Sequence, residues 1–195
     1  MPNPRPAPDT PVADPAPGAS MYRRTPADLR TERLALVTLT PELARAALED
    51  REELGRVLGA RVPPTWPGAD FARMLPRIAH SPAAPFTCLI IHEGDRTVIG
   101  ETGFHGPPDG TGTVEAGYSI IPDYRSRGFA YEATRALIEA ALASPGINHV
   151  IAECLHDNAP SLRVLEKLGM RRAGSAGSAV RFELRKARYS GLRKE

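Results

Sequence analysis

The chain has 195 residues, of which 42% are hydrophobic and 25% charged, and its formal net charge is +2 at pH 7. This length and composition are typical of one soluble globular domain with a sizeable core, and they exclude a fibre or a wholly disordered chain. The charges nearly cancel, so we expect no nucleic-acid partner, and no window approaches the roughly 18 apolar residues that span a membrane. Because nothing resembles a secretory signal either, we expect a cytoplasmic protein without a membrane partner.

Two terminal segments are predicted to lie outside the folded domain. Residues 1–27 are rich in Pro, Ala and Asp with almost no large apolar side chain, so they cannot bury enough surface to offset the entropy of ordering. We interpret them as a disordered arm. Residues 188–195 are locally basic, which is typical of a solvated tail. The folded domain is therefore expected over residues 28–187.

The first half of this domain is predicted to contain a short strand followed by helices. The pair Thr40-Pro41 is a helix-start signal, and a second short helix is expected over residues 51–58. A proline-stiffened loop then carries Trp66, the only tryptophan of the chain. A further helical stretch is expected over residues 70–79.

Three strand-like runs follow, over residues 86–92, 97–105 and 113–121. Each is rich in β-branched and other apolar residues, and turn residues separate them. Short turns join antiparallel neighbours. The three runs are therefore predicted to form an antiparallel meander.

The hydrophobic period then changes from two to 3.6, which predicts a helix that begins near Gly128. A continuous apolar strand is expected over residues 149–155, a helix that starts after Asn158, and a hairpin over 171–186. This order of elements predicts a mixed sheet with a strand–helix–strand unit at its centre.

The cysteines and histidines give no sign of a disulfide or a metal centre. Cys88 and Cys154 both lie inside predicted strands, where a thiol behaves as a small buried hydrophobic group. The five histidines show no ligand spacing with one another or with the cysteines. We therefore expect no metal site.

The segment from Arg125 to Ala130 is the strongest candidate for binding an anion. A helix that begins near Gly128 presents free backbone N–H groups and a positive dipole end to a phosphate. Gly128 allows a ligand to approach the main chain closely, and Arg125 and Arg127 add positive charge. By its spacing alone the segment is also compatible with a purely structural turn.

The sequence around this loop resembles the GCN5-related N-acetyltransferase (GNAT) superfamily. Residues 115–130 look like its fourth strand and acyl-CoA pyrophosphate loop, and residues 157–170 look like its second signature, in which an Asn starts a helix ending in Glu-Lys-x-Gly. Residues 31–34, Thr-Glu-Arg-Leu, resemble the opening of the ribosomal-protein-acetylating branch. The resemblance extends from about residue 31 to 186 in the right order.

This resemblance implies an α/β (α+β) GNAT fold with a mixed, mostly antiparallel sheet of about seven strands and the acyl-CoA site at its centre. It implies acetyl-CoA as co-substrate, with the pantetheine arm in a gap between the fourth and fifth strands. The implied cofactor-binding residues are Ser119, Ile120 and Ile121 through their main chains, Arg125, Ser126, Arg127, Gly128, Phe129 and Ala130 in the loop, and Asn158 and Ser161 on the next helix. Asn158 is equally well explained as a helix cap.

Acetyl transfer to an amine requires a proton acceptor, and the resemblance points to Glu115, which occupies the position of the base in histone-acetylating relatives. A carboxylate that only orients a cationic amine is the alternative for Glu115. His105, at the end of the preceding strand, is a second candidate base. Trp66 is a candidate wall of the substrate pocket or, alternatively, an anchor of its own loop.

The leaving thiolate requires a proton donor, and here the chain departs from the family pattern. Many relatives carry a Tyr seven residues after the helix-start Asn, where this chain has Leu165. Ser161 matches a serine with that role in some relatives and is our substitute, and solvent is the alternative. Tyr118 and Tyr124 are further candidates for this donor, although Tyr118 is expected to pack on the sheet.

The predicted function is acetyl transfer from acetyl-CoA to a primary amine by direct attack in a ternary complex. The acceptor is predicted to be a small-molecule amine or a peptide or protein N-terminus, and the protein a monomer or homodimer. The alternative is a non-catalytic acyl-CoA-binding or sensing module. Leu165 favours that alternative and Glu115 argues against it.

Overall fold

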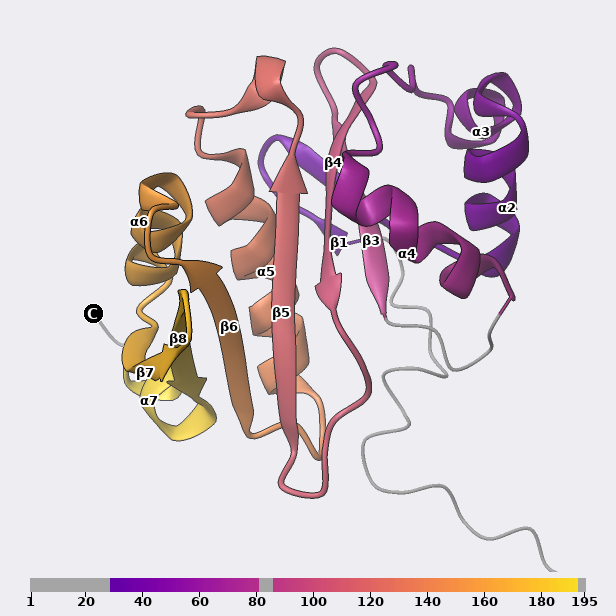
Figure 1. Cartoon of the computed structure of the whole chain (residues 1–195). Coiled ribbons are helices and arrows are strands. Elements are labelled where there is room, and N and C mark those ends of the chain that lie inside the picture. Colours follow the sequence, from indigo (N-terminus) through magenta and orange to yellow (C-terminus); the bar gives the residue numbers. More distant parts are fainter. Residues whose placement is uncertain (1–28, 81–85, 193–195) are drawn as a thin grey trace, which may run out of the picture.

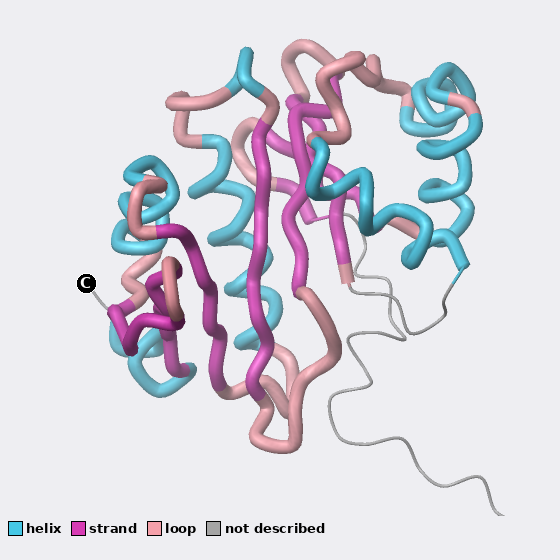
Figure 2. Tube along the Cα trace, viewed as in Figure 1, coloured by secondary structure: helices cyan, strands magenta, loops and turns pink. Residues whose placement is uncertain are grey.

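A computed structural model describes residues 29–80 and 86–192. The proposed N-terminal arm lies outside these residues. The chain forms a twisted sheet with helices on both faces, as Figure 1 shows, and Figure 2 shows the strands running through the middle of the molecule between the helices.

The sheet has eight strands in the order β1-β2-β3-β4-β5-β6-β8-β7. All neighbours are antiparallel except β5 and β6. The strands are β1 (Leu29–Arg30), β2 (Leu34–Thr38), β3 (Thr87–His92), β4 (Thr97–Phe104), β5 (Thr113–Ile120), β6 (His149–Leu155), β7 (Arg171–Ala176) and β8 (Ala179–Arg185). The predicted mixed α/β sheet and its β3-β4-β5 meander are confirmed. The strand beyond the expected seven is β1, a two-residue edge strand.

The helices lie on both faces of this sheet. They are α2 (Pro41–Glu49), α3 (Arg51–Leu58), α4 (Ala69–His80), α5 (Phe129–Ala143), α6 (Ala159–Lys167) and α7 (Lys186–Leu192). Helix α4 covers β3 and β4 from one side, and α5 lies behind β5 on the opposite side (Figure 1). The two sides of the central strands therefore have different neighbours.

The helix starts follow from local capping. The side chain of Thr40 accepts a hydrogen bond from the N–H of Leu43, and Asn158 accepts one from the N–H of Ser161. Each bond satisfies one of the N–H groups that have no partner inside the first helical turn. Pro41 and Pro160 follow these caps in the first turn, where a missing N–H costs nothing.

Strands β5 and β6 are paired only at their beginnings, over the three residue pairs from Thr113 with His149 to Glu115 with Ile151. Beyond these pairs β5 continues along β4, and β6 continues along β8. Figure 1 shows the two strands diverging toward the end of β5. Main-chain groups on the β6 side of β5 are therefore left without a strand partner over residues 116–120.

Helix α7 was not expected from the sequence, which indicated a basic tail from residue 188. Tyr189 on this helix is buried, and its hydroxyl donates a hydrogen bond to the Glu139 carboxylate on α5. Cys88 is buried as predicted, whereas Cys154 is only half-buried.

Candidate active site

A cleft of about 740 Å³ opens along the gap beyond the β5–β6 pairing. Its lining contains most of the residues that the family resemblance assigned to the cofactor: Ser119, Ile120, Arg125, Ser126, Gly128, Phe129, Ala130, Asn158 and Ser161. The cleft is bounded by β5, the loop before α5 and the first turn of α6. Ile121 and Arg127 are absent from the lining.

The loop between β5 and α5 turns sharply on both sides of Arg127. Ser126 has φ of 59° and Gly128 has φ of 83°, and α5 begins at the next residue. The helix N-terminus and its unpaired N–H groups thus border the cleft, which is the arrangement that favours a bound phosphate. Gly128 holds a left-handed conformation in which a side chain would be strained.

The side chain of Arg127 does not lie where the sequence predicted. Its guanidinium lies 5.2 Å from the Tyr124 ring centroid and 5.1 Å from that of Phe129. It lines a separate surface cleft with Arg33 and Glu132. The backbone turn explains the difference, because it aims this side chain away from the cleft that holds Arg125.

The register of β5 determines which main-chain N–H groups face the gap. The N–H of Ile121 donates to the carbonyl of Ile99, and the carbonyl of Glu115 accepts from the N–H of His105. The N–H and C=O groups of successive strand residues point to opposite sides. Residues an odd number of positions from Glu115 or Ile121 therefore direct these groups away from β4, toward the gap. The donors that face the gap are therefore those of Tyr118 and Ile120, whereas the N–H groups of Ser119 and Ile121, which the resemblance also implied, face β4 within the sheet.

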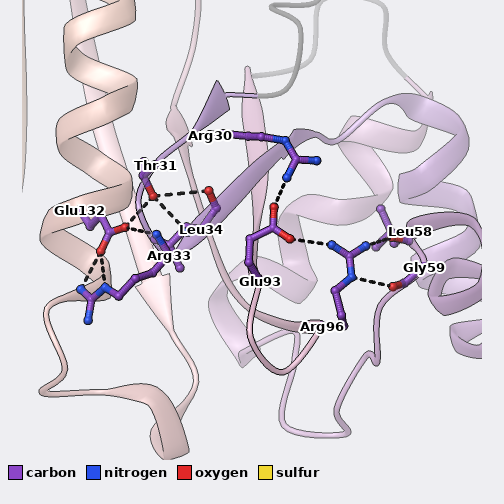
Figure 3. Close-up of polar contacts among 9 residues, drawn as sticks. All are labelled: Arg30, Thr31, Arg33, Leu34, Leu58, Gly59, Glu93, Arg96 and Glu132. Carbon is purple, nitrogen blue, oxygen red and sulfur yellow. Dashed lines mark hydrogen bonds and ion pairs between the residues drawn. The ribbon is translucent and has the colours of Figure 1, made fainter.

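The Thr-Glu-Arg-Leu motif holds the start of α5 against the sheet (Figure 3). One carboxylate oxygen of Glu132 accepts hydrogen bonds from the Thr31 hydroxyl at 2.6 Å and from the Arg33 N–H at 2.9 Å. The other accepts from the Arg33 guanidinium at 2.7 Å, which also reaches the carbonyl of Arg127 at 3.2 Å. The motif thus fixes the loop of residues 125–130, the predicted phosphate loop, together with the first turn of α5.

The ionisation of Glu132 reflects these contacts. Burial raises the pKa of Glu132, but the hydrogen bonds from Thr31 and Arg33 together outweigh burial and hold that pKa below its ordinary value. A carboxylate in the first turn of α5 would repel a nearby phosphate, and the Arg33 guanidinium at 2.6 Å neutralises it.

A second, smaller cleft of about 370 Å³ lies between α4 and the central strands. Phe71, Met74 and Phe104 give it apolar walls. The two clefts share four lining residues, namely Asp70, Tyr118, Ser119 and Arg125. A ligand in one cleft therefore meets a ligand in the other beside Ser119.

His105 and Glu115, the two predicted bases, lie together. The Nδ1 atom of His105 is 3.1 Å from a carboxylate oxygen of Glu115. His105 lines the smaller cleft, whereas Glu115 lines neither cleft. Glu115 therefore stands behind His105 and contacts the cleft only through it.

Glu101 is a carboxylate in the smaller cleft that the sequence analysis missed. It lies on β4 directly opposite Ser119, and only 6% of it is exposed. Ser119 Oγ donates to one of its oxygens at 2.5 Å, and the Trp66 Nε1–H donates to the other at 2.7 Å. A glutamate inside an otherwise apolar strand is the signal that could have found it, because a buried carboxylate needs partners.

Trp66, a candidate wall of the substrate pocket from the sequence, lines neither cleft. It is 1% exposed and packs on Phe71, with ring centroids 6.1 Å apart. Its carbonyl accepts a hydrogen bond from Arg51 at 2.6 Å. Trp66 is the anchor of its loop, and it reaches the cleft only through its bond to Glu101.

On α6, the cap residue Asn158 and Ser161 both line the larger cleft. The hydroxyl of Tyr118 donates to the main-chain carbonyl of Ser161 at 3.4 Å, so the phenol crosses the gap between β5 and α6. Burial raises the pKa of Tyr118, which keeps the phenol protonated at neutral pH. Leu165 is buried in the core and is absent from the lining of the larger cleft.

Within residues 29–80 and 86–192, no group of three or more His, Cys, Asp or Glu side chains is arranged to hold a metal ion. In the same part of the chain, no helix is both long enough and apolar enough to cross a membrane.

A sheet whose fifth and sixth strands splay apart over a helix N-terminus, with a second cleft meeting the gap, defines an acyl-CoA-dependent transferase fold. The sequence matches the family model described as Acetyltransferase (GNAT) domain over residues 33–171, well over half of the chain. The chain belongs to the GNAT family of acetyl-CoA-dependent N-acetyltransferases.

Individual relatives agree with this assignment. The chain is 33% identical over 147 residues to the uncharacterised N-acetyltransferase YjdG of Bacillus subtilis, covering 72% of this chain and 88% of that protein. The structure of a putative ribosomal-protein-serine acetyltransferase from Vibrio cholerae superposes with a TM-score of 0.59 at 18% identity, covering 83% of this chain and 98% of the other. The microcin C7 self-immunity acetyltransferase MccE, solved with acetyl-CoA and AMP, gives a TM-score of 0.58 at 12% identity over 80% of this chain and 93% of its own. The two structures show a common fold.

Proposed function

We propose that this N-acetyltransferase acetylates a primary amine held in the smaller cleft, using acetyl-CoA held in the larger one, in a single ternary complex. The observation that carries this proposal is the junction of the two clefts at Tyr118 and Ser119. Direct attack requires that the two reacting atoms lie close together, and two clefts with a shared wall place their ligands side by side.

The larger cleft suits the shape and charge of acetyl-CoA. The helix N-terminus at Gly128 and the guanidinium of Arg125 would hold the pyrophosphate, and the unpaired edge of β5 would hold the pantetheine amides. Asn158 and Ser161 would contact the ligand from the α6 side. When bound, acetyl-CoA supplies an acetyl group activated as a thioester.

The N–H groups of Tyr118 and Ile120 are the donors that would stabilise negative charge on the thioester carbonyl oxygen. Both face the gap, and the sheet fixes both before a ligand arrives. Donors of this kind act without reorganisation, and removing one from an enzyme costs roughly 10²–10³ in kcat. We therefore assign this role to the main chain rather than to a side chain.

The His105–Glu115 pair would accept the proton of the amine. The amine nitrogen forms a bond to the acetyl carbon, the carbon–sulfur bond breaks, and the nitrogen loses a proton to His105 Nε2, directly or through water. Glu115, 3.1 Å from Nδ1, would orient the ring and stabilise the imidazolium that forms. This assignment gives both predicted bases a part, with His105 nearer the amine.

The leaving thiolate would gain its proton from a hydroxyl on the far side of the gap. Ser161 lines the cleft, and the Tyr118 hydroxyl is bonded to the Ser161 carbonyl, so both hydroxyls lie in the same part of the cleft. Of the two groups the phenol is the stronger acid. We therefore add Tyr118 to Ser161 as a proton donor for this step.

The acceptor is proposed to be an amine that is small at the reacting end, such as a metabolite amine or a peptide N-terminus. A cleft of about 370 Å³ with apolar walls holds one or two residues of a peptide, and its open side allows a longer chain to continue into solvent. An amine and N-terminal-peptide library incubated with acetyl-CoA, with thiol release and product mass measured, tests this proposal. Acetyl-CoA binding without turnover on any amine would support a sensing module instead.

A further inference from the structure

The carboxylate of Glu101 is a buried acid that the reaction steps above do not use. Its two hydrogen-bond partners, Trp66 Nε1 and Ser119 Oγ, are both neutral donors. Both oxygens thus accept a hydrogen bond, which is what an ionised carboxylate does. Among the ion pairs of residues 29–80 and 86–192, none includes Glu101.

A buried carboxylate without a cation is costly for the fold. Burial raises the pKa of Glu101, although the hydrogen bonds from Ser119 and Trp66 partly oppose that rise. A cation that enters the cleft would offset part of the desolvation free energy of this carboxylate, because it pairs with a charge that solvent hardly reaches. The site is therefore prepared for a positively charged ligand.

The position of Glu101 is next to the expected reaction centre. It faces Ser119 across the β4–β5 ladder, where the two clefts meet. The next pair along this face of the ladder is Gly103 with Gly117, which forms a floor without side chains of its own between Glu101 and His105, and the His105 imidazole lies over Gly117. An amine on this floor lies between the two groups.

Resting on the proposed function, we propose that Glu101 is the acceptor-recognition residue, whose carboxylate binds the ammonium form of a primary alkylamine. It selects cationic amines over neutral acceptors of the same shape. The bound ammonium first loses one proton to solvent, and the neutral amine then attacks the thioester and loses its second proton to His105. The apolar side chains of Phe71, Met74 and Phe104 hold the carbon atoms beside the amine.

Other charged groups face the same cleft and enter the interpretation of any pH profile. Asp70 and Arg125 lie at the junction with the larger cleft, and His105 lies at the far end of the floor. Arg125 is held by its hydrogen bond from Nε to the Ile120 carbonyl at 2.8 Å. None of the three forms a hydrogen bond or an ion pair with the Glu101 carboxylate, whose partners are Trp66 and Ser119, so exchanging Glu101 isolates its contribution.

Trp66 provides a direct optical probe, because it is the only tryptophan and it donates to Glu101. We would titrate the full-length protein, without acetyl-CoA, with benzylamine and n-butylamine and with the corresponding alcohols, and follow Trp66 emission at neutral pH. We expect saturable changes with the amines and about 10-fold to 100-fold weaker binding of the alcohols, as for a hydrogen bond to a charged group. The Glu101→Gln variant should lose this preference.

Two variants act as controls. Glu52→Gln removes the same charge from an exposed position on α3, outside the cleft, and should bind like the wild type. Trp66→Phe should abolish the signal. Equal binding of amine and alcohol by the wild type, no saturable change with either amine, or unchanged amine binding by Glu101→Gln would each overturn the proposal.

Turnover gives a second measurement on the best acceptor from the library. For Glu101→Gln we expect the KM of a cationic amine to rise about 10-fold or more while the KM of acetyl-CoA stays within about twofold. A lowered kcat with an unchanged amine KM would contradict the assignment. Because the emission titration uses no acetyl-CoA, its failure is distinguishable from a failure of acetyl transfer.

Discussion

The Nδ1 atom of His105 lies 3.1 Å from a carboxylate oxygen of Glu115, and this contact joins the end of β4 to the beginning of β5. The main chain reinforces it, since the His105 N–H donates to the Glu115 carbonyl at 2.9 Å. The opposite edge of the imidazole lies over Gly117: a Cβ added there would be 2.6 Å from Nε2. The ring is therefore fixed with Nε2 above the floor of the smaller cleft.

The pair predicts a shared loss of activity when either member is exchanged. Glu115→Gln and His105→Gln should each lower kcat/KM for the amine by about 10²–10⁴, the contribution of a positioned general base. Because the two residues act together, the double variant should lose little more than His105→Gln alone. Acetyl-CoA affinity, measured by calorimetry, should be unchanged in all three. Fully additive losses would show that Glu115 and His105 act separately.

Gly117 offers a test of the same geometry without any change of charge. Gly117→Ala would place a methyl group against Nε2 and displace the imidazole from the cleft floor. We expect at least a tenfold loss of kcat/KM, since small displacements of a catalytic group cost about 10²-fold. Gly110→Ala is the matched control, because an added Cβ there meets nothing within 4 Å. Wild-type turnover by Gly117→Ala would remove His105 from the mechanism.

The phosphate loop is tested by two exchanges at Gly128. Gly128→Ala keeps the neutral loop but strains a residue with φ of 83°, at a cost of about 1–2 kcal/mol. Gly128→Glu adds a carboxylate beside the proposed pyrophosphate position and should abolish acetyl-CoA binding in calorimetry. A similar modest loss in both variants would mean that strain alone explains the effect, and that the pyrophosphate binds elsewhere.

Glu132 makes stability depend on pH in acid. Because its pKa is lowered in the folded protein, its ionised form stabilises the fold above the unfolded pKa, and this contribution is lost as the pH falls through the folded pKa. Glu132→Gln should therefore lower Tm at pH 7, with about 2–4 °C for each kcal/mol lost in a domain of this size. At pH 3 the difference should shrink. An equal difference at both pH values would show that the charge of Glu132 is not the cause.

Glu101 should make the stability of the fold depend on pH in the opposite direction. Its pKa is raised in the folded protein, so the protonated form favours folding, and that contribution disappears as the pH rises through the folded pKa. Glu101→Gln should then raise Tm at pH 8 relative to the wild type and leave it nearly unchanged at pH 4. Lower stability at pH 8 would indicate that Glu101 is kept for the fold and not for the acceptor.

The sequence predicted most element boundaries because they depend on local chemistry. Thr40 and Asn158 cap helices through their own side chains. The turn residues of the meander interrupt the strand-like apolar runs and so mark the ends of the strands. Helix α7 was missed because its one buried aromatic, Tyr189, is held by Glu139, 50 residues earlier in the chain.

The direction of single side chains was beyond sequence reasoning. Arg127 lies inside the predicted loop, but the positive φ angles at its two neighbours aim it away from the cleft. Trp66 and Glu101 are 35 residues apart, and no periodicity links a loop indole to a strand carboxylate. Pairings of this kind depend on how α4 and its loop pack on the sheet, which is a tertiary property.

The central claim is direct acetyl transfer between two ligands bound at the same time. Initial rates measured while acetyl-CoA and an amine are varied together, with the product identified by mass spectrometry, test it most directly. We predict intersecting double-reciprocal lines and one N-acetylated amine for each CoA released, with no acetylated enzyme. Parallel lines with an acetylated protein intermediate, or CoA release without an N-acetyl product, would contradict it.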